Sequence, residues 1–209
     1  MKIMPPERPE ASIQRLISAL MPVSTPVSVV PRKRLAWSYQ GKPQFYLFLE
    51  GEVSVLRATD GLVMATAYDP LLFGVAEAMQ GVHCQTLRVD TQATLRRVDA
   101  EQAMNILTEK QLWQDVASSF SYFSSYLFYR DALVVQQRTY SVICNHLQEM
   151  IQLPLETRLR VSILEYIQER THLSRSTVLN IIHALKQGDY ISTSRGGYLL
   201  ELNPLPEEF

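Results

Sequence analysis

The sequence predicts an α+β protein in which a β jelly roll, a long helix and a winged helix-turn-helix follow one another along the chain. Short alternating runs separated by turn residues fill residues 27–98 of the 209 and are typical of strands. After residue 99, apolar residues recur with helical spacing instead. Two helical patterns, a tight turn and a glycine-tipped hairpin then follow in order between residues 159 and 200. We therefore expect three parts, residues 1–107, 108–152 and 153–209.

The composition is that of an ordinary globular protein, since 46% of the residues are hydrophobic. No apolar run approaches the about 20 residues that span a bilayer, and the N-terminus lacks the apolar stretch of a signal peptide. The two cysteines, Cys84 and Cys144, form no CxxC pair. We therefore expect a cytoplasmic protein that keeps its thiols reduced and binds no membrane.

The first part combines a short helix with several strands. Residues 8–21 place apolar side chains on one helical face, and Pro22 prevents further helix because proline lacks a backbone N–H. Later runs, such as residues 45–49, read as strands. Asp60 and Gly61 give a hairpin signal, since both tolerate positive φ. These features predict a small β-barrel or jelly roll.

Helices dominate the middle of the chain. Asp99 is placed to cap a short helix through Leu107. Longer helical patterns cover residues 111–130 and 139–151. The helix over residues 111–130 is apolar and aromatic over more than one stripe, so it needs two neighbours, such as the barrel and a second subunit. Burial of this helix within one subunit is the alternative.

The sharpest signal is the helix-turn-helix. Ser174 is an N-cap candidate for the second helix, because its hydroxyl can accept an orphan backbone N–H. That helix runs to about Gln187, and Gly188 suits a left-handed stop. The expected buried residues are Val161, Leu164 and Ile167 in the first helix, and Val178, Ile181, Ile182 and Leu185 in the second.

The outward face of the second helix carries side chains that suit DNA recognition. An arginine can donate two hydrogen bonds to guanine, and an asparagine can pair with adenine. Residues in the first turn of such a helix reach base edges when it enters the major groove. Residues 190–200 read as a wing that brings an arginine to the sugar-phosphate backbone. We therefore expect double-stranded DNA as a partner, bound through Ser174, Arg175, Ser176, Thr177, Asn180, His183 and Arg195.

Charge gives this interpretation limited support. The formal net charge of the whole chain is −1. Residues 158–200 contain six basic and three acidic side chains, so this span carries +3. A local basic patch favours a nucleic-acid partner even when the whole chain is nearly neutral.

Several motifs resemble a known superfamily of regulators. The segments LSRSTV at residues 173–178 and GDYI at residues 188–191 resemble the recognition helix and wing of the cyclic AMP receptor protein/fumarate-nitrate regulator superfamily. Residues 45–53 and 72–74 resemble its sensor barrel. More narrowly, nearly the whole chain is similar to the enterobacterial winged-helix regulators called inhibitor of hydrogen peroxide resistance. The segments that carry this likeness are residues 111–113, 143–147, 166–167, 170–171 and 203–206.

The resemblance implies a cyclic-nucleotide-binding-like sensor domain, a long dimerisation helix and a homodimer on a roughly palindromic operator. The narrower likeness implies a connection with oxidative stress. By position, Arg175, Ser176 and Asn180 are the candidates for reading bases. The superfamily commonly has Glu where Ser176 stands and Arg where Asn180 stands, so we expect a different operator sequence.

The sensor half departs further from the superfamily. Cyclic-nucleotide binders place Glu directly after their Phe-x-Gly motif and later carry an Arg for the phosphate. Here Val75 follows Gly74, and the later stretch reads HCQT at residues 83–86. Without the arginine the phosphate would lack its partner in a buried site. We therefore expect that cyclic AMP does not bind, and an unidentified small-molecule effector remains open.

Other chemistry finds little support in the sequence. Two cysteines are too few for a four-cysteine iron–sulfur cluster, and clustered metal ligands and catalytic motifs are missing, so we expect no metal, no cofactor and no enzyme. His83 beside Cys84 is open to two interpretations: a haem or oxidant sensor, or a turn histidine beside a packed cysteine. Cys144 is expected in a helical core, and His172 in the solvated turn of the helix-turn-helix.

A rival function stays open at this stage. The same fold could serve as a protein-interaction or small-molecule-sensing module that has lost specific DNA binding. The near-neutral charge and the unusual Ser176 and Asn180 leave room for it. The sequence does not give the effector, the operator, or whether the outcome is repression or activation.

Overall fold

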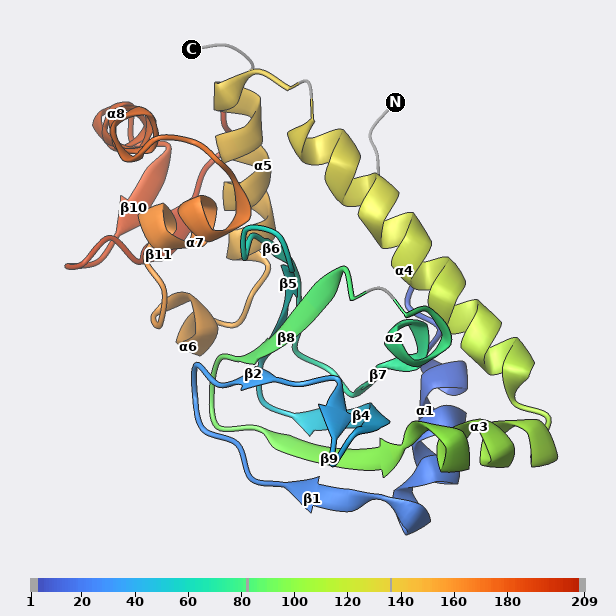
Figure 1. Ribbon diagram of the computed structural model, residues 1–209. Helices are drawn as coiled ribbons and strands as arrows, with labels where there is room; N and C mark the ends of the chain where they lie inside the picture. The colour runs from blue at the N-terminus through green and yellow to red at the C-terminus, as the bar shows by residue number, and fades with distance from the viewer. Residues whose placement is uncertain (1–3, 82, 136, 207–209) are drawn as a thin grey trace. The chain divides into compact units, whose positions relative to one another are not determined.

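The computed structural model describes residues 4–81, 83–135 and 137–206. It divides the chain into two compact units, Met1–Tyr129 and Arg130–Phe209, each with its own hydrophobic core (Figure 1). The first unit combines sheets with helices, and the second is mainly helical with a small hairpin. The predicted α+β class is confirmed.

The strands of the first unit form two antiparallel sheets, as expected for a jelly roll. They are β1 (Thr25–Val27), β2 (Arg34–Leu35), β3 (Ser38–Tyr39), β4 (Lys42–Glu50), β5 (Val53–Arg57), β6 (Val63–Ala67), β7 (Leu71–Phe73), β8 (Gln85–Val89) and β9 (Thr94–Asp99). One sheet has the order β1-β9-β4-β3, with β7 also pairing with β4, and the other has the order β2-β8-β5-β6. The register is well defined; Phe45 pairs with Val98, for example, and Val55 with Leu87.

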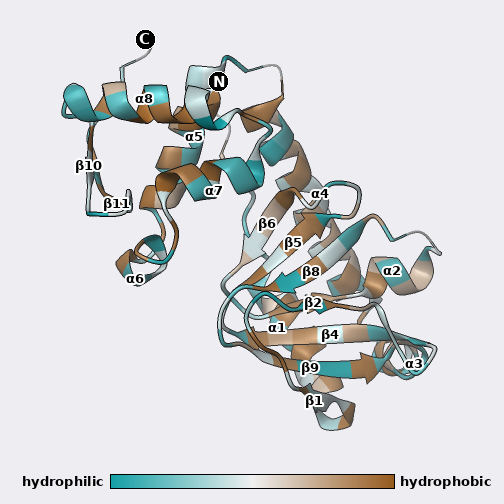
Figure 2. Ribbon diagram, turned by 60° about the vertical axis from the view of Figure 1, so that its left-hand side comes forward, coloured by the Kyte–Doolittle hydropathy of each residue, from teal (hydrophilic) through white to brown (hydrophobic). Residues whose placement is uncertain are grey.

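Aromatic side chains lie in the core of this unit. Phe45 and Phe48 are completely buried, and Tyr46 and Trp37 nearly so. The two polar aromatic tips find partners, because Trp37 Nε1 donates to the carbonyl oxygen of Gln85 at 2.7 Å and Tyr46 Oη donates to that of Ala36 at 2.6 Å. Figure 2 shows hydrophobic residues concentrated along β4 and β5. Aromatic rings therefore occupy part of a core that is otherwise mainly aliphatic.

Helices pack around this core. They are α1 (Glu10–Leu20), the 3-10 turn η1 (Met21–Val23), α2 (Val75–Met79), α3 (Ala100–Glu109) and α4 (Trp113–Val134), the last of which continues into the second unit. The predicted cap of α3 is confirmed, since Asp99 Oδ1 accepts from the backbone N–H groups of Glu101 and Gln102 at 3.1 and 3.2 Å.

An ion pair fixes the start of α4 to α1. The guanidinium of Arg15 donates to both carboxylate oxygens of Asp115, with Nη2–Oδ1 at 2.6 Å and Nε–Oδ2 at 3.1 Å. Asp115 and Val116 are buried. Further along α4, Leu127 and Phe128 have 50% and 75% of their surface exposed. The predicted aromatic face of this helix is therefore covered only in part within one chain.

The second unit is a winged helix-turn-helix with an additional helix in its core. Its elements are α5 (Thr139–Ile151), α6 (Leu155–Arg158), α7 (Ile163–Arg170), α8 (Arg175–Gln187), β10 (Ile191–Thr193) and β11 (Leu199–Leu202). Ile143, Leu147 and Met150 of α5 are completely buried in the same core as α7 and α8. The core of this unit therefore begins before residue 153, where the sequence pattern changes.

The buried face of α7 differs from the predicted one. The sequence indicated Val161, Leu164 and Ile167, but the side chains that are buried are Ile163, Tyr166 and Ile167. The helix begins only at Ile163, because the hydroxyl of Ser162 caps it by accepting from the backbone N–H of Glu165 at 3.2 Å. Val161 therefore precedes the helix, and Leu164 is only partly buried.

The predicted left-handed stop at Gly188 is wrong. Gly188 has φ −87°, and the left-handed residue is Asp189 with φ 56°. Glycine is needed here for a different reason: a Cβ at this position would lie 2.5 Å from Cε2 of Tyr190. The close approach of this ring, which belongs to the start of the wing, leaves no room for a side chain.

We expect Asp115→Asn to lower the Tm of the first unit by a few degrees, because Arg15 loses its charged partner. The hydrogen bonds from Arg15 hold the pKa of Asp115 below its usual value. Such a carboxylate stabilises the folded state above its unfolded pKa, and this contribution is lost as the pH falls through the folded pKa. The difference in Tm, measured by calorimetry, should therefore be present at about pH 7 and shrink below about pH 3.

A matched control for this experiment is Asp60→Asn, which weakens an ion pair with Arg57 whose carboxylate is more exposed (32% against 11% for Asp115), and it should change the Tm less. A Tm difference for Asp115→Asn that is the same at both pH values would contradict the assigned ion pair.

We expect Gly188→Ala to destabilise the second unit by about 1–3 kcal/mol, because the added methyl group overlaps the ring of Tyr190. The measurement is the midpoint of urea unfolding. Gly81→Ala is the control, since a Cβ there meets open space. Equal midpoints for the two variants would show that Tyr190 moves aside at no cost.

Candidate nucleic-acid interface

The start of α8 is fixed by a network of hydroxyl groups. The predicted cap is confirmed: Ser174 Oγ accepts from the backbone N–H of Thr177 at 3.2 Å. The same oxygen lies 2.7 Å from Thr177 Oγ1 and 3.0 Å from Ser176 Oγ. In the preceding turn, Thr171 Oγ1 donates to the carbonyl oxygen of Ile167 at 2.8 Å. The first turn of α8 therefore has a defined position relative to α7.

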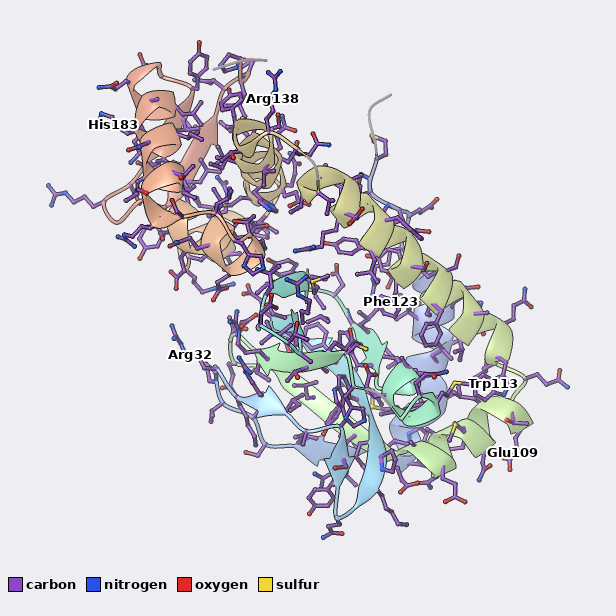
Figure 3. All side chains as sticks on the ribbon, turned by 45° about the horizontal axis from the view of Figure 1, so that its top comes forward. Arg32, Glu109, Trp113, Phe123, Arg138 and His183 are labelled. Atoms are coloured by element: carbon purple, nitrogen blue, oxygen red, sulfur yellow. The ribbon has the colours of Figure 1, made fainter. Side chains whose placement is uncertain are left out.

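Three apolar side chains fix the rotation of α8 about its axis. Val178 and Leu185 are completely buried and Ile182 nearly so, as predicted. Ile181 is only partly buried and lies at the edge of the core. The opposite side of the helix is in solvent, and Figure 3 labels His183 on this outer side. The polar face of α8 therefore points away from the core of its unit.

The candidate residues lie where a duplex could reach them. In α8 and its cap, Ser174, Arg175, Ser176, Asn180 and His183 are exposed, and Thr177 is half-buried. Within the described part of the chain, the side chain of Arg175 has no hydrogen-bonding or ionic partner. Its guanidinium is thus available to a ligand.

Sequence reasoning missed one residue of this face. Leu179 has 41% of its surface exposed, although it lies next to the buried Val178. Its distance of four positions from Arg175 could have revealed it, because residues i and i+4 share a helix face. The buried stripe expected from the sequence does not include Leu179, and the expected polar face does not include it either.

Hydrogen bonds fix the wing at its tip and at its base. The backbone N–H of Ile163, at the start of α7, donates to the carbonyl oxygen of Gly197 at 3.0 Å. At the base of the wing, Asn203 Nδ2 donates to the carbonyl oxygen of Asp189 at 2.8 Å. Arg195 is exposed in the turn between β10 and β11. The predicted wing is present, and its tip lies beside the N-terminus of α7.

Two arginines of the basic segment hold the unit together instead of facing a ligand. Arg158 Nη1 donates to the carbonyl oxygens of Leu199 and Leu200 at 3.1 and 2.7 Å. The guanidinium of Arg170 lies over the ring of Tyr166, 3.7 Å from its centre. Part of the positive charge counted in the sequence is therefore structural.

An open groove lies between α7, α8 and the wing. Side chains of opposite charge line it, with acids on α7 and bases on α8. Its lining includes Ser162, Glu165, Glu169, Arg175, Leu179, Lys186 and Gly196. The bases on α8 therefore extend along the helix beyond its first turn.

In the sensor half, the structure reveals a buried acid that the sequence comparison had passed over. Glu77 of α2 is only 8% exposed, and its Oε2 has no hydrogen-bond partner among the described residues. It lies two positions after Val75, the residue that replaces the superfamily's glutamate. Burying a polar atom without a hydrogen-bond partner costs free energy of folding.

The histidine–cysteine pair differs from its expected environment. His83 and Cys84 are both exposed, so the interpretation of Cys84 as a packed cysteine is wrong. Its place in the loop before β8 leaves the thiol in solvent, while its carbonyl oxygen accepts from the backbone N–H of Ala58 at 2.9 Å. Cys144 is buried as predicted, and burial raises the pKa of its thiol, which disfavours the reactive thiolate.

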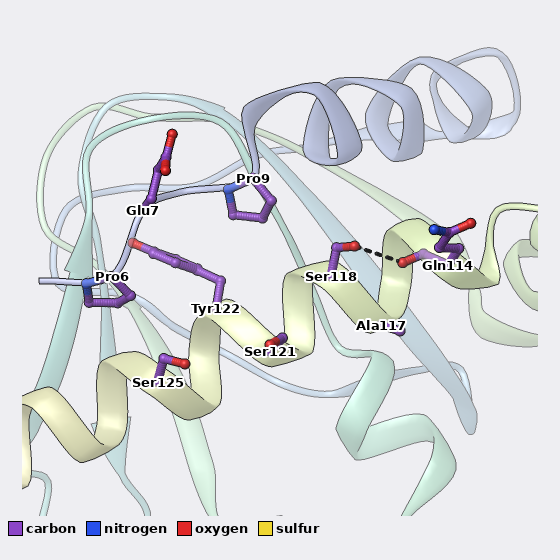
Figure 4. Close-up of a pocket in the computed structure, with 9 residues that line it drawn as sticks. All are labelled: Pro6, Glu7, Pro9, Gln114, Ala117, Ser118, Ser121, Tyr122 and Ser125. Atoms are coloured by element: carbon purple, nitrogen blue, oxygen red, sulfur yellow. Dashed lines mark hydrogen bonds between the residues drawn. The ribbon is translucent and has the colours of Figure 1, made fainter.

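A second groove lies along the N-terminal half of α4. Figure 4 shows Tyr122 pointing toward the segment that contains Pro6 and Glu7, with small side chains such as Ser121 and Ser125 beside it. Ser118 Oγ donates to the carbonyl oxygen of Gln114 at 3.0 Å and so satisfies its own hydroxyl. This groove contains no cluster of charged groups.

Two searches of the described residues gave negative results. No group of three or more histidine, cysteine or acidic side chains lies close enough together to hold a metal ion within residues 4–81, 83–135 and 137–206. In the same part of the chain, no helix is both long and apolar enough to cross a membrane.

Comparison with known proteins gives both a family and a fold. Residues 139–207 match the family model described as winged helix-turn-helix DNA binding. The inhibitor of hydrogen peroxide resistance of Salmonella typhimurium is 30% identical over 165 residues, which cover 78% of this chain and 79% of that protein. The protein of the same name from Escherichia coli K12 is 29% identical over the same length.

Solved structures share the fold at lower identity. The c-di-GMP responsive global regulator CLP of Xanthomonas campestris has a TM-score of 0.71 at 16% identity, covering 92% of this chain and 100% of that one. A putative crp/fnr-family regulator from Eubacterium rectale has a TM-score of 0.66 at 12% identity, covering 90% of both chains. With its jelly roll, long helix and C-terminal winged helix-turn-helix, the chain belongs to the inhibitor of hydrogen peroxide resistance family of DNA-binding transcription regulators, which has the fold of the cyclic AMP receptor protein/fumarate-nitrate regulators.

Proposed function

We propose that this regulator acts in the cytoplasm as a homodimer that binds a two-fold symmetric operator, with α8 in the major groove. The observation that carries the proposal is the orientation of α8, which buries Val178, Ile182 and Leu185 and leaves its polar side in solvent. A duplex can accept this face without any rearrangement of the unit. Affinity then comes mainly from phosphate contacts and specificity from a few base contacts.

We assign the roles by chemistry and position. Arg175 and Ser176 in the first turn, and Asn180 one turn later, contact base edges. Ser174 and Thr177 lie at the helix N-terminus, where backbone N–H groups favour a phosphate. His183 lies further along the same side, and Arg195 at the tip of the wing contacts the sugar-phosphate backbone.

The dimer would form through α4. Leu127 and Phe128 expose large apolar surfaces in the C-terminal half of a 22-residue helix. Apolar side chains repeated along one helix suit an antiparallel or parallel helix pair with a second copy. Two-fold symmetry of the dimer would then match the symmetry of the operator.

The sensor half supports a function without cyclic AMP. Val75 stands where the resemblance implies a glutamate for the ribose, and the stretch HCQT at residues 83–86 lacks the arginine that it implies for the phosphate. A different small molecule, or none, would act on this domain.

A protein-interaction or sensing module without specific DNA binding is the second candidate. The exposed apolar side chains of Leu155 and Leu159, which are 50% and 43% accessible, favour it because a protein partner would cover them. The two functions are separated by selection of random duplexes on the purified chain. Enrichment of a two-fold symmetric motif supports the regulator, whereas salt-sensitive binding without selection supports the module. Neither candidate requires catalysis.

We expect Arg175→Ala to weaken binding to the enriched operator by about 1–3 kcal/mol and to relax the preference at one base pair. The measurement is a gel-shift titration on the operator and on single-base-pair variants. Arg34→Ala, an exposed arginine of β2, is the control and should leave affinity unchanged. An equal loss on unrelated duplexes would make Arg175 a phosphate contact instead.

We expect Phe128→Glu to raise the dimer Kd by at least about 30-fold, because a charge would be buried where an aromatic side chain was packed. Sedimentation equilibrium measures this change. Lys110→Glu, at an exposed position between α3 and α4, serves as the control. A wild-type chain that is monomeric at micromolar concentration, or a Phe128 variant as dimeric as the wild type, would exclude this interface.

A further inference from the structure

One apolar side chain occupies the middle of an otherwise polar face. Leu179 lies four positions after Arg175, one before Asn180 and four before His183, and 41% of its surface is exposed. Residues three and four positions apart are neighbours on one side of a helix, so Leu179 is a neighbour of Arg175, Ser176 and His183. Leu179 therefore lies within the polar face of α8. This face is formed by Arg175, Ser176, Asn180 and His183.

The core does not need Leu179. Val178, Ile182 and Leu185 already fill the contact between α8 and its unit and are at most 6% exposed. Leu179 instead lines the groove between α7, α8 and the wing, together with Arg175, Lys186 and Gly196. Any ligand that reaches both Arg175 and Asn180 must cover Leu179 as well.

We infer that Leu179 reads the 5-methyl group of a thymine in the major groove, an inference that rests on the proposed function. A leucine side chain offers no hydrogen bond, so placing it against the polar edge of guanine, adenine or cytosine would leave that edge unpaired. The thymine methyl is the apolar feature of the major-groove edge. Leu179 thus adds a preference for thymine to the hydrogen bonds of the flanking polar residues.

The position of this thymine follows from helix geometry. Four residues of helix rise about 6 Å, and successive base pairs are separated by about 3.4 Å along the duplex. The thymine therefore lies within about two base pairs of the base that Arg175 contacts. In a homodimer the same thymine occurs once in each half of the operator.

Replacement of thymine by deoxyuridine tests the inference without changing the protein. Each thymine of the enriched operator is replaced in turn, in both half-sites together, and the Kd is measured by fluorescence anisotropy. One position in each half-site should lose about four-fold in affinity per half-site, because a single buried methyl group is removed. Leu179→Ala should bind the thymine operator more weakly, and it should show no further loss with deoxyuridine at that position.

Leu155→Ala is the matched control, because Leu155 is an exposed leucine outside α8, and this variant should keep the full loss with deoxyuridine. The inference is overturned if no thymine replacement affects the wild type, or if Leu179→Ala keeps the same loss. The proposed function survives both of these results, since the operator is still selected. If random duplexes yield no enriched motif, both the inference and the proposed function fail.

Discussion

The attachment of α8 to its core is the constraint on which the rest of the C-terminal unit depends. Val178, Ile182 and Leu185 recur at helical spacing, and their burial fixes the rotation of the helix. Because each residue turns a helix by about 100°, slipping this stripe by one position would move Asn180 toward the core. The cap at Ser174 fixes where the helix begins. Together these contacts decide which side chains a duplex can meet.

The arginines of this unit differ in role according to their position. Arg158 donates to carbonyl oxygens of β11, and Arg170 stacks on Tyr166, so both stabilise the frame that carries the wing. Arg175 and Arg195 are exposed at the start of α8 and at the tip of the wing. A count of basic residues treats all four alike. Only their contacts distinguish the arginines that stabilise the unit from those that a phosphate could reach.

The sensor half keeps the jelly-roll frame but alters its chemistry. Rings such as Phe45 and Phe48 lie in the core, and the polar tips of Trp37 and Tyr46 bond to the backbone. The one-turn helix α2 contains a buried acid, Glu77, whose Oε2 has no hydrogen-bond partner among the described residues. The sensor half therefore combines an apolar core with a buried carboxyl group on α2.

The sequence alone determined the order of the parts, because apolar periodicity and capping residues are local. It predicted α5 and α8 with the bounds observed and identified Asp99 and Ser174 as caps. Tertiary packing decided the rest: Gly188 is glycine because the ring of Tyr190 lies against it, and Leu179 is outside because three other residues fill the core. These two features depend on tertiary contacts, and the spacing of residues along the chain does not predict them.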